Sequence, residues 1–187
     1  MRALGLTLLL LAACAPAPAR LVGTELQPQG APDFTLTDGI TGKAFTLSAQ
    51  QGRVAVVSFL YTHCPDVCPL TAEGFKQAQR ALTDDERDRV IFVAVSVDPQ
   101  KDTPEAVQAF ARDHGLTRNF AFLVGGAAQL QAVWTAYGIR IEPDPTFVGH
   151  SDAIYLVDKR GRARVLTHSD IRPQDLVTDL KLLAAER

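Results

Sequence analysis

The sequence predicts an α/β fold in which helices flank a central mixed sheet. Two uninterrupted apolar runs, residues 54–60 and 90–97, are rich in β-branched residues, which is typical of strands buried on both faces. A segment with helical apolar spacing follows each run, so helix-length crossovers should connect parallel strands. Alternating apolar and polar residues over 34–47 and 153–167 add antiparallel hairpins. The chain should therefore have a largely parallel centre with antiparallel edges.

The first elements expected are a hairpin and a central strand. Residues 34–37 and 44–47 alternate in polarity, and the turn-forming pairs Asp38-Gly39 and Thr41-Gly42 lie between them. The buried strand 54–60 follows, and it leads directly into a segment that carries two cysteines.

A helix should begin at Pro69 and run through Arg80, because proline lacks the N–H that the first turn leaves unpaired. Proline also disfavours helical geometry in the residue before it, which predicts that Cys68 is a cap residue with Cys64 in the preceding turn. The inward face of this helix is apolar at four positions: Leu70, Phe75, Ala78 and Leu82.

The next elements are a charged connection over 84–89, the second central strand and a further helix. Thr103 can cap this helix and Pro104 fits its first position, whereas Gly115 should end it. A third short strand, 120–124, precedes a helix that carries Trp134 on its core face.

The last part of the domain should begin with a loop over 139–149, since it contains Pro143 and Pro145. A strand over 153–158, its hairpin partner and a final helix from Pro173 complete the order. This order matches a thioredoxin-like fold. In open α/β sheets the ligand site lies at the carboxyl ends of the strands, where Cys64 falls.

The N-terminus is expected to be a targeting segment. Arg2 precedes an apolar run too short to span a bilayer, and Leu11-Ala12-Ala13-Cys14 resembles a lipobox, although an ordinary secretory signal is the alternative. The predicted organisation is a signal peptide over 1–13, a lipidated Cys14 with a flexible tether over 14–30, and one domain over 31–187. The protein should be exported and anchored to the membrane by lipid, facing the periplasm or another extracytoplasmic space.

The formal charge of −2 is small, and no basic run is present, which argues against nucleic acid as a partner.

Cys64 and Cys68 are the two cysteines that remain after Cys14. In an exported protein such a pair is by default a disulfide, but a Cys64–Cys68 bridge would close a very short loop and so stabilise little. The pair is therefore better explained as a reactive dithiol or as part of a metal site.

Three segments in order resemble signatures of the Sco/SenC family of copper-binding, thioredoxin-like proteins. Residues 62–69 carry its CxxxC segment, residues 97–104 (VDPQKDTP) its second signature, and His150-Ser151 with 155–158 its histidine signature. The resemblance implies copper bound by Cys64, Cys68 and His150. The family often has Asp before the histidine, where this chain has Gly149.

The residue chemistry suits copper. Thiolates favour Cu(I), and two thiolates with an imidazole can also hold Cu(II) if oxygen completes a flatter geometry. A helix N-terminus nearby would lower a thiol pKa. Structural zinc is disfavoured because it would usually need a fourth protein ligand, and none is evident. The sole methionine, Met1, would leave with the signal peptide, so a thioether is excluded as a copper ligand.

Other polar residues near these signatures are expected to play structural parts. His63 adjoins Cys64 but should point elsewhere, His114 should lie at a helix end, and His168 should be at the surface. Asp66 and Asp98 could cap or form turns, or could hydrogen-bond the site.

The resemblance implies a copper metallochaperone for the binuclear copper centre of cytochrome c oxidase. Its partners would be the copper-bearing oxidase subunit and, in addition, another copper chaperone or a thiol reductant. An enzymatic alternative is a thiol-disulfide reductase in which Cys64 and Cys68 keep the oxidase cysteines reduced. A peroxiredoxin-type peroxidase is disfavoured because Tyr61 stands where those enzymes carry Thr.

Overall fold

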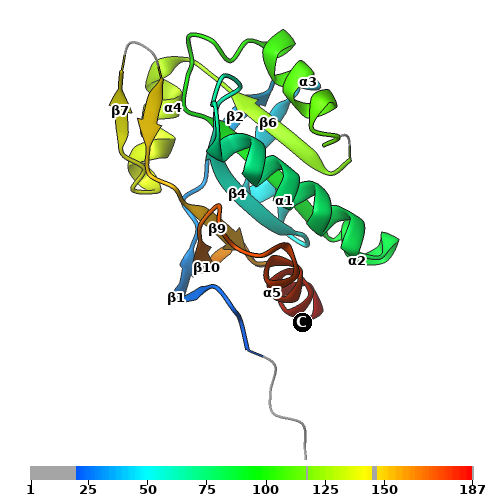
Figure 1. Cartoon of the computed structure of the whole chain (residues 1–187). Coiled ribbons are helices and arrows are strands. Elements are labelled where there is room, and N and C mark those ends of the chain that lie inside the picture. Colours follow the sequence, from blue (N-terminus) through cyan, green and yellow to red (C-terminus); the bar gives the residue numbers. More distant parts are fainter. Residues whose placement is uncertain (1–19, 117, 145–146, 187) are drawn as a thin grey trace, which may run out of the picture.

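A computed structural model describes residues 20–116, 118–144 and 147–186. An eight-stranded mixed sheet in the order β1-β10-β9-β4-β5-β6-β2-β3 forms its centre, and a separate ribbon pairs β7 with β8 (Figure 1). The strands are β1 (Thr24–Gly30), β2 (Thr35–Asp38), β3 (Ala44–Thr46), β4 (Val54–Leu60), β5 (Val90–Ser96), β6 (Phe120–Val124), β7 (Ile141–Pro143), β8 (Val148–His150), β9 (Ile154–Val157) and β10 (Arg162–Thr167). The helices are α1 (Val67–Ala81), α2 (Asp84–Asp88), α3 (Pro104–Asp113), α4 (Ala127–Ala136) and α5 (Pro173–Ala185), with a 3₁₀ turn η1 at Ser48–Gln50.

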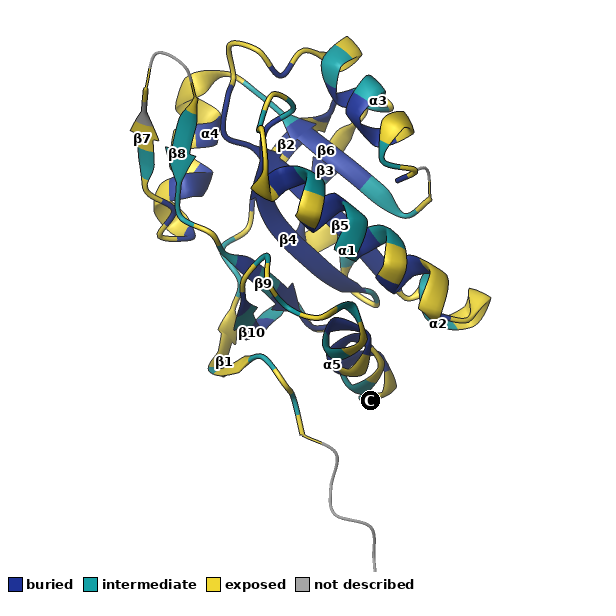
Figure 2. Cartoon of the chain, in the orientation of Figure 1, coloured by how far each residue is buried: buried dark blue, intermediate teal, exposed yellow. Residues whose placement is uncertain are grey.

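The predicted parallel centre is confirmed. β4 pairs with β5 and β5 with β6 in parallel, whereas β9 runs antiparallel to β4. Every residue of β4 and β5 is buried, as their uninterrupted apolar runs predict, and Figure 2 shows β4 buried along its length. The register Leu60↔Ser96 brings the carboxyl ends of the two strands to the same edge of the sheet.

The core joins the helices to this sheet. α1 and α5 pack against one another, and Phe75 of α1 stacks on Phe92 of β5 with ring centroids 5.0 Å apart. Trp134 of α4 is 5% exposed, and its Nε1–H donates to the Ser96 carbonyl over 3.0 Å, which confirms its predicted core position. Gly115 and Gly138 end α3 and α4 at φ of +69° and +68°, values that favour glycine.

The predicted boundary between tether and domain is wrong. Residues Thr24–Gly30 form β1, which pairs antiparallel with β10 at the edge of the sheet. Just before it, the N–H groups of Val22 and Gly23 donate to the Asp179 carboxylate over 2.6 and 3.0 Å. Residues 22–30 therefore belong to the folded domain, which was predicted to start at residue 31. β1 is almost wholly exposed and held by backbone hydrogen bonds, so its sequence carries no apolar signal.

The predicted signal peptide and Cys14 lie outside the described residues. Within the described part of the chain, no helix has the length and apolar character needed to cross a bilayer.

The segment 139–149, predicted as a loop, contains β7 and β8 in its described part. They pair antiparallel with the register Ile141↔His150 and Glu142↔Gly149. The prolines in this segment led to the loop prediction. Strands form nevertheless, because an isolated pair of three-residue strands needs few ladder hydrogen bonds and tolerates proline at an edge.

Helix α1 also begins earlier than predicted. Asp66 is its N-cap and accepts from the Val67 N–H, so Cys68 lies inside the first turn and is not the cap. Pro69 is accommodated because first-turn N–H groups have no partner within the helix. The charged connection likewise contains a short helix, α2, capped by Thr83.

Candidate functional site

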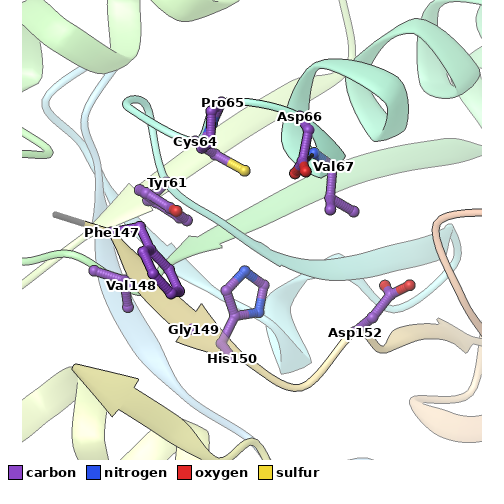
Figure 3. A pocket seen from close by; sticks show the side chains of 10 residues that line it. All are labelled: Tyr61, Cys64, Pro65, Asp66, Val67, Phe147, Val148, Gly149, His150 and Asp152. Atoms are coloured by element: carbon purple, nitrogen blue, oxygen red, sulfur yellow. Dashed lines mark hydrogen bonds between the residues drawn. The ribbon is translucent and has the colours of Figure 1, made fainter. Parts of the chain in front are cut away.

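A cavity of about 390 Å³ lies at the connection between β4 and α1, against the β7–β8 ribbon. Figure 3 shows its lining side chains, which come from two segments that are far apart in the sequence. The cavity is lined by Tyr61, Cys64, Pro65, Asp66, Val67, Phe147, Val148, Gly149, His150 and Asp152.

Cys64 presents a thiolate to this cavity. Its hydrogen bond with the Cys68 side chain lowers its pKa most, and the backbone N–H groups of Cys68 and Asp66 add to the effect against the opposing effect of burial. The pKa of Cys64 is about 5 as a result. The Cys68 N–H donates to the Cys64 sulfur over 3.3 Å, an interaction typical of a thiolate beside a helix N-terminus.

Cys68 is a fully buried thiol beneath Cys64. The side-chain hydrogen bond to Cys64 and its burial both raise its pKa far above the ordinary range. The Cys68 thiol therefore keeps its proton and is the donor in this side-chain hydrogen bond, with Cys64 as the acceptor. Neither cysteine takes part in a disulfide in this structure.

Tyr61 contacts both Cys64 and His150. It is 3% exposed, and burial, followed by the nearby negative charge on Cys64, raises its pKa to about 12. Its hydroxyl therefore stays protonated at neutral pH. The Tyr61 ring meets the His150 ring edge-on, with centroids 6.0 Å apart, which limits the orientations open to the imidazole.

His150 stands at the end of β8 with its ring in the cavity (Figure 3). Its Nδ1 lies 2.9 Å from the Ser151 carbonyl oxygen. A carbonyl can only accept, so the neutral imidazole carries its proton on Nδ1 and has its lone pair on Nε2. Metal-binding histidines are commonly prepared in this way, with the second nitrogen donating to a backbone carbonyl.

The structure thus brings Cys64 and His150 to one cavity, whereas Cys68 lies below it. Across residues 20–186, apart from the gaps noted above, no group of three or more His, Cys, Asp or Glu side chains is already close enough to hold a metal ion. The donor types nevertheless suit a soft metal: one thiolate, one thiol that can lose its proton and one imidazole with a free lone pair.

Comparison with known proteins assigns the chain to a family. The family model described as SCO1/SenC matches residues 23–185. The chain belongs to the SCO1/SenC family. The matched range begins next to β1, in agreement with the inclusion of β1 in the domain.

Solved Sco structures share its fold. Apo Sco1 from Thermus thermophilus has a TM-score of 0.78 and 30% identity, and the match covers 89% of this chain and 99% of that one. Copper-bound ScoI from Bradyrhizobium japonicum has a TM-score of 0.71 and 30% identity, over 83% and 99% of the chains. A SCO1/SenC family lipoprotein from Bacillus anthracis has a TM-score of 0.74 and 26% identity, over 84% and 98%. The predicted thioredoxin-like α/β fold and the predicted family are confirmed.

The other polar residues considered from the sequence have structural roles or lie away from the cavity. Asp66 lines the cavity but serves as a helix cap, and Asp98 accepts from the N–H groups of Gln100 and Lys101 in a turn. The remaining histidines, His63, His114 and His168, do not line the cavity.

Gly149 stands where the family often carries Asp, and the ribbon explains why a small residue fits. A Cβ placed there would lie 3.3 Å from the Glu142 carbonyl oxygen and 3.4 Å from the Glu142 Cβ. The close pairing of β7 with β8 therefore leaves little room for a side chain at this position.

Asp102 was not identified from the sequence, although it supports the cysteine segment. It is 4% exposed and accepts from the Thr62 N–H (2.9 Å), the Thr62 hydroxyl (2.7 Å) and the Ser96 hydroxyl (2.6 Å). It thereby ties the end of β5 to the residues that follow β4. The sequence signal for Asp102 was its position within the 97–104 signature, but its hydrogen-bond partners are known only from the fold.

Proposed function

We propose that this protein carries copper on Cys64, Cys68 and His150 and delivers it to the copper-bearing subunit of cytochrome c oxidase. The observation that supports this most is the pairing of a thiolate and an imidazole with a free Nε2 in one cavity. Copper is the cargo of such a carrier, which takes the ion up and releases it by ligand exchange. The acceptor is the one that the family resemblance implies.

The protonation states support uptake of a soft cation. Cys64 is already ionised near neutral pH, so it can bind first. Cys68 must lose its proton to become a ligand, so loading should release about one proton per copper. Copper bound to the related ScoI of Bradyrhizobium japonicum is consistent with this cargo.

The proposal includes a membrane tether at Cys14, with the domain on the extracytoplasmic side. The lipobox-like sequence and the lipoprotein status of the related Bacillus anthracis protein support it. A tether would raise the effective concentration of the carrier near a membrane-bound acceptor.

The test is a Cu(I) competition titration of the reduced protein against a chromophoric chelator, without oxygen. Cys64→Ser, Cys68→Ser and His150→Ala should each weaken Cu(I) binding by at least about tenfold, the equivalent of ~1.4 kcal/mol. His168→Ala is the matched control, because His168 is exposed and lies outside the cavity. Equal affinity in all four variants would contradict the ligand set.

A second candidate, thiol-disulfide reduction, is favoured by the division between a reactive Cys64 and a protonated Cys68. The Cys64 thiolate would attack a disulfide of the oxidase subunit, and one of the subunit's thiolates would leave. Cys68 would then lose its proton and attack the mixed disulfide, so that two electrons pass to the subunit and Cys64 and Cys68 become a disulfide. An external thiol reductant would restore the pair.

His150 separates the two candidates, since dithiol exchange does not require an imidazole. The carrier proposal predicts that His150→Ala impairs both copper binding and oxidase maturation. Loss of tight copper binding with normal maturation would instead favour the reductase.

A further inference from the structure

The rim of the cavity is unusually apolar for an exposed surface. Within the described ranges, four large apolar residues are exposed: Val22 at 51%, Val67 at 38%, Leu70 at 67% and Phe147 at 50%. Three of them gather near the cavity. Val67 and Phe147 line it from opposite segments, and Leu70 follows Val67 by three positions on α1, so the two side chains are neighbours on the helix surface.

These residues do not contribute to the core in the way their types usually do. Leu70 was expected on the inward face of its helix, yet it is 67% exposed while Phe75 of the same helix is 1% exposed. Its exposure follows from the position of α1, which begins at Val67 and turns Cys68 inward. Clustered exposed apolar side chains beside a functional cavity commonly mark a protein contact surface.

The charge around this rim has one sign. Among the residues that line the cavity, the carboxylates are Asp66 and Asp152, both exposed, and no Lys or Arg is among them. A surface of this kind should favour a partner whose contact surface is apolar at its centre and basic at its edge.

We propose that Val67, Leu70 and Phe147, with the carboxylates Asp66 and Asp152, form the surface on which the copper-accepting protein docks. The inference rests on the proposed function, because ligand exchange between two proteins requires their donor atoms to meet at the mouth of this cavity. The rim would exclude water from that meeting point and orient the acceptor. A basic edge on the acceptor would speed its approach.

The experiment measures binding and copper transfer for the full chain in mild detergent. The acceptor is the soluble copper-bearing domain of the oxidase subunit. Leu70→Ser and Phe147→Ser should each weaken acceptor binding about tenfold, as loss of an interface hot spot does. Val22→Ser is the matched control, since Val22 is also half exposed and is remote in sequence from the rim. It should leave binding unchanged.

A second measurement separates docking from copper binding. Cu(I) affinity and copper transfer to a small thiol such as glutathione should be the same in wild type and Leu70→Ser, because Leu70 does not line the cavity. Transfer to the acceptor domain at limiting concentration should slow in the two rim variants, and the wild-type association rate should fall as salt increases.

The outcomes distinguish failure of the inference from failure of the proposed function. If the wild type holds no copper but the rim variants still lose affinity for the acceptor, the carrier proposal fails and the docking surface stands. If copper binds and passes equally fast from all variants, the docking inference is wrong. Sedimentation that shows a wild-type dimer lost in Leu70→Ser would assign the rim to a second copy and would also overturn it.

Discussion

At the scale of single residues, the fold gives two cysteines of one short motif opposite protonation states. Cys64 is half-buried at the cavity, where its sulfur accepts hydrogen bonds, whereas Cys68 is fully buried and donates one. Buried thiols resist ionisation, but a thiolate that accepts several hydrogen bonds is stabilised. One sulfur is therefore poised for attack or metal uptake, and the second can act only after losing a proton.

This division predicts the pH dependence of alkylation. The reactive form is the thiolate, so the rate at which iodoacetamide modifies Cys64 in the reduced, metal-free protein should rise with pH around the pKa of about 5 and then level off. An ordinary cysteine would still gain reactivity up to pH ~8.5. Mass spectrometry of the modified protein gives the rate. Cys68→Ala removes the side-chain donor that lowers the Cys64 pKa most, so the midpoint should move upward in that variant. A wild-type midpoint near that of a free thiol would contradict the hydrogen-bonded thiolate.

At the scale of elements, the start of α1 positions both cysteines. Asp66 caps the helix through the Val67 N–H, which places Cys68 in the first turn and leaves Cys64 just before it. The same residue lines the cavity. The helix start and the site geometry are thus set by one local interaction.

Asp66→Ala should lower the free energy of unfolding by about 1 kcal/mol, because the first turn loses its side-chain cap. Asp66→Asn should retain most of that stability, since asparagine caps almost as well without the charge. Urea unfolding of the reduced, metal-free proteins measures both. Equal losses in the two variants would show that charge, and not capping, is what Asp66 contributes.

At the scale of the whole molecule, the residues just before β1 are tied to the last helix. Asp179 of α5 is 0% exposed and accepts from the N–H groups of Val22 and Gly23, next to β1. Burial raises the pKa of this carboxyl, which is held in the interior by these two donors. The point at which the N-terminal segment joins the domain is therefore fixed against α5.

Asp179→Ala should destabilise the protein by roughly 1–3 kcal/mol, because the N–H groups of Val22 and Gly23 lose their acceptor at a partly buried contact. Asp85→Ala is the control: Asp85 is exposed on α2, and its removal should change stability by less than about 0.5 kcal/mol. Thermal or urea unfolding compares the two. A loss for Asp179→Ala no larger than the control's would mean that the contact does not anchor β1.

The elements that could be predicted from sequence are those that carry a local pattern. The runs of β4 and β5 are apolar throughout because both faces of these strands are covered, and Thr103-Pro104 begins α3 with a cap and a proline. β1 and the β7–β8 ribbon were not predicted, because backbone pairing holds these strands together while their side chains are exposed or partly exposed. Their sequences therefore lack the periodic pattern of apolar residues that marks a strand.

The sequence by itself determined that a dithiol follows the central strand of a thioredoxin-like SCO1/SenC domain, since strand pattern and motif are both local. Only the tertiary structure decided that Cys64 faces the cavity while Cys68 lies beneath it, that His150 enters on a separate ribbon, and that Asp102 ties Thr62 to Ser96. These relations join residues that are distant in the chain. They depend on burial and on hydrogen-bond partners that exist only after the sheet and helices have packed.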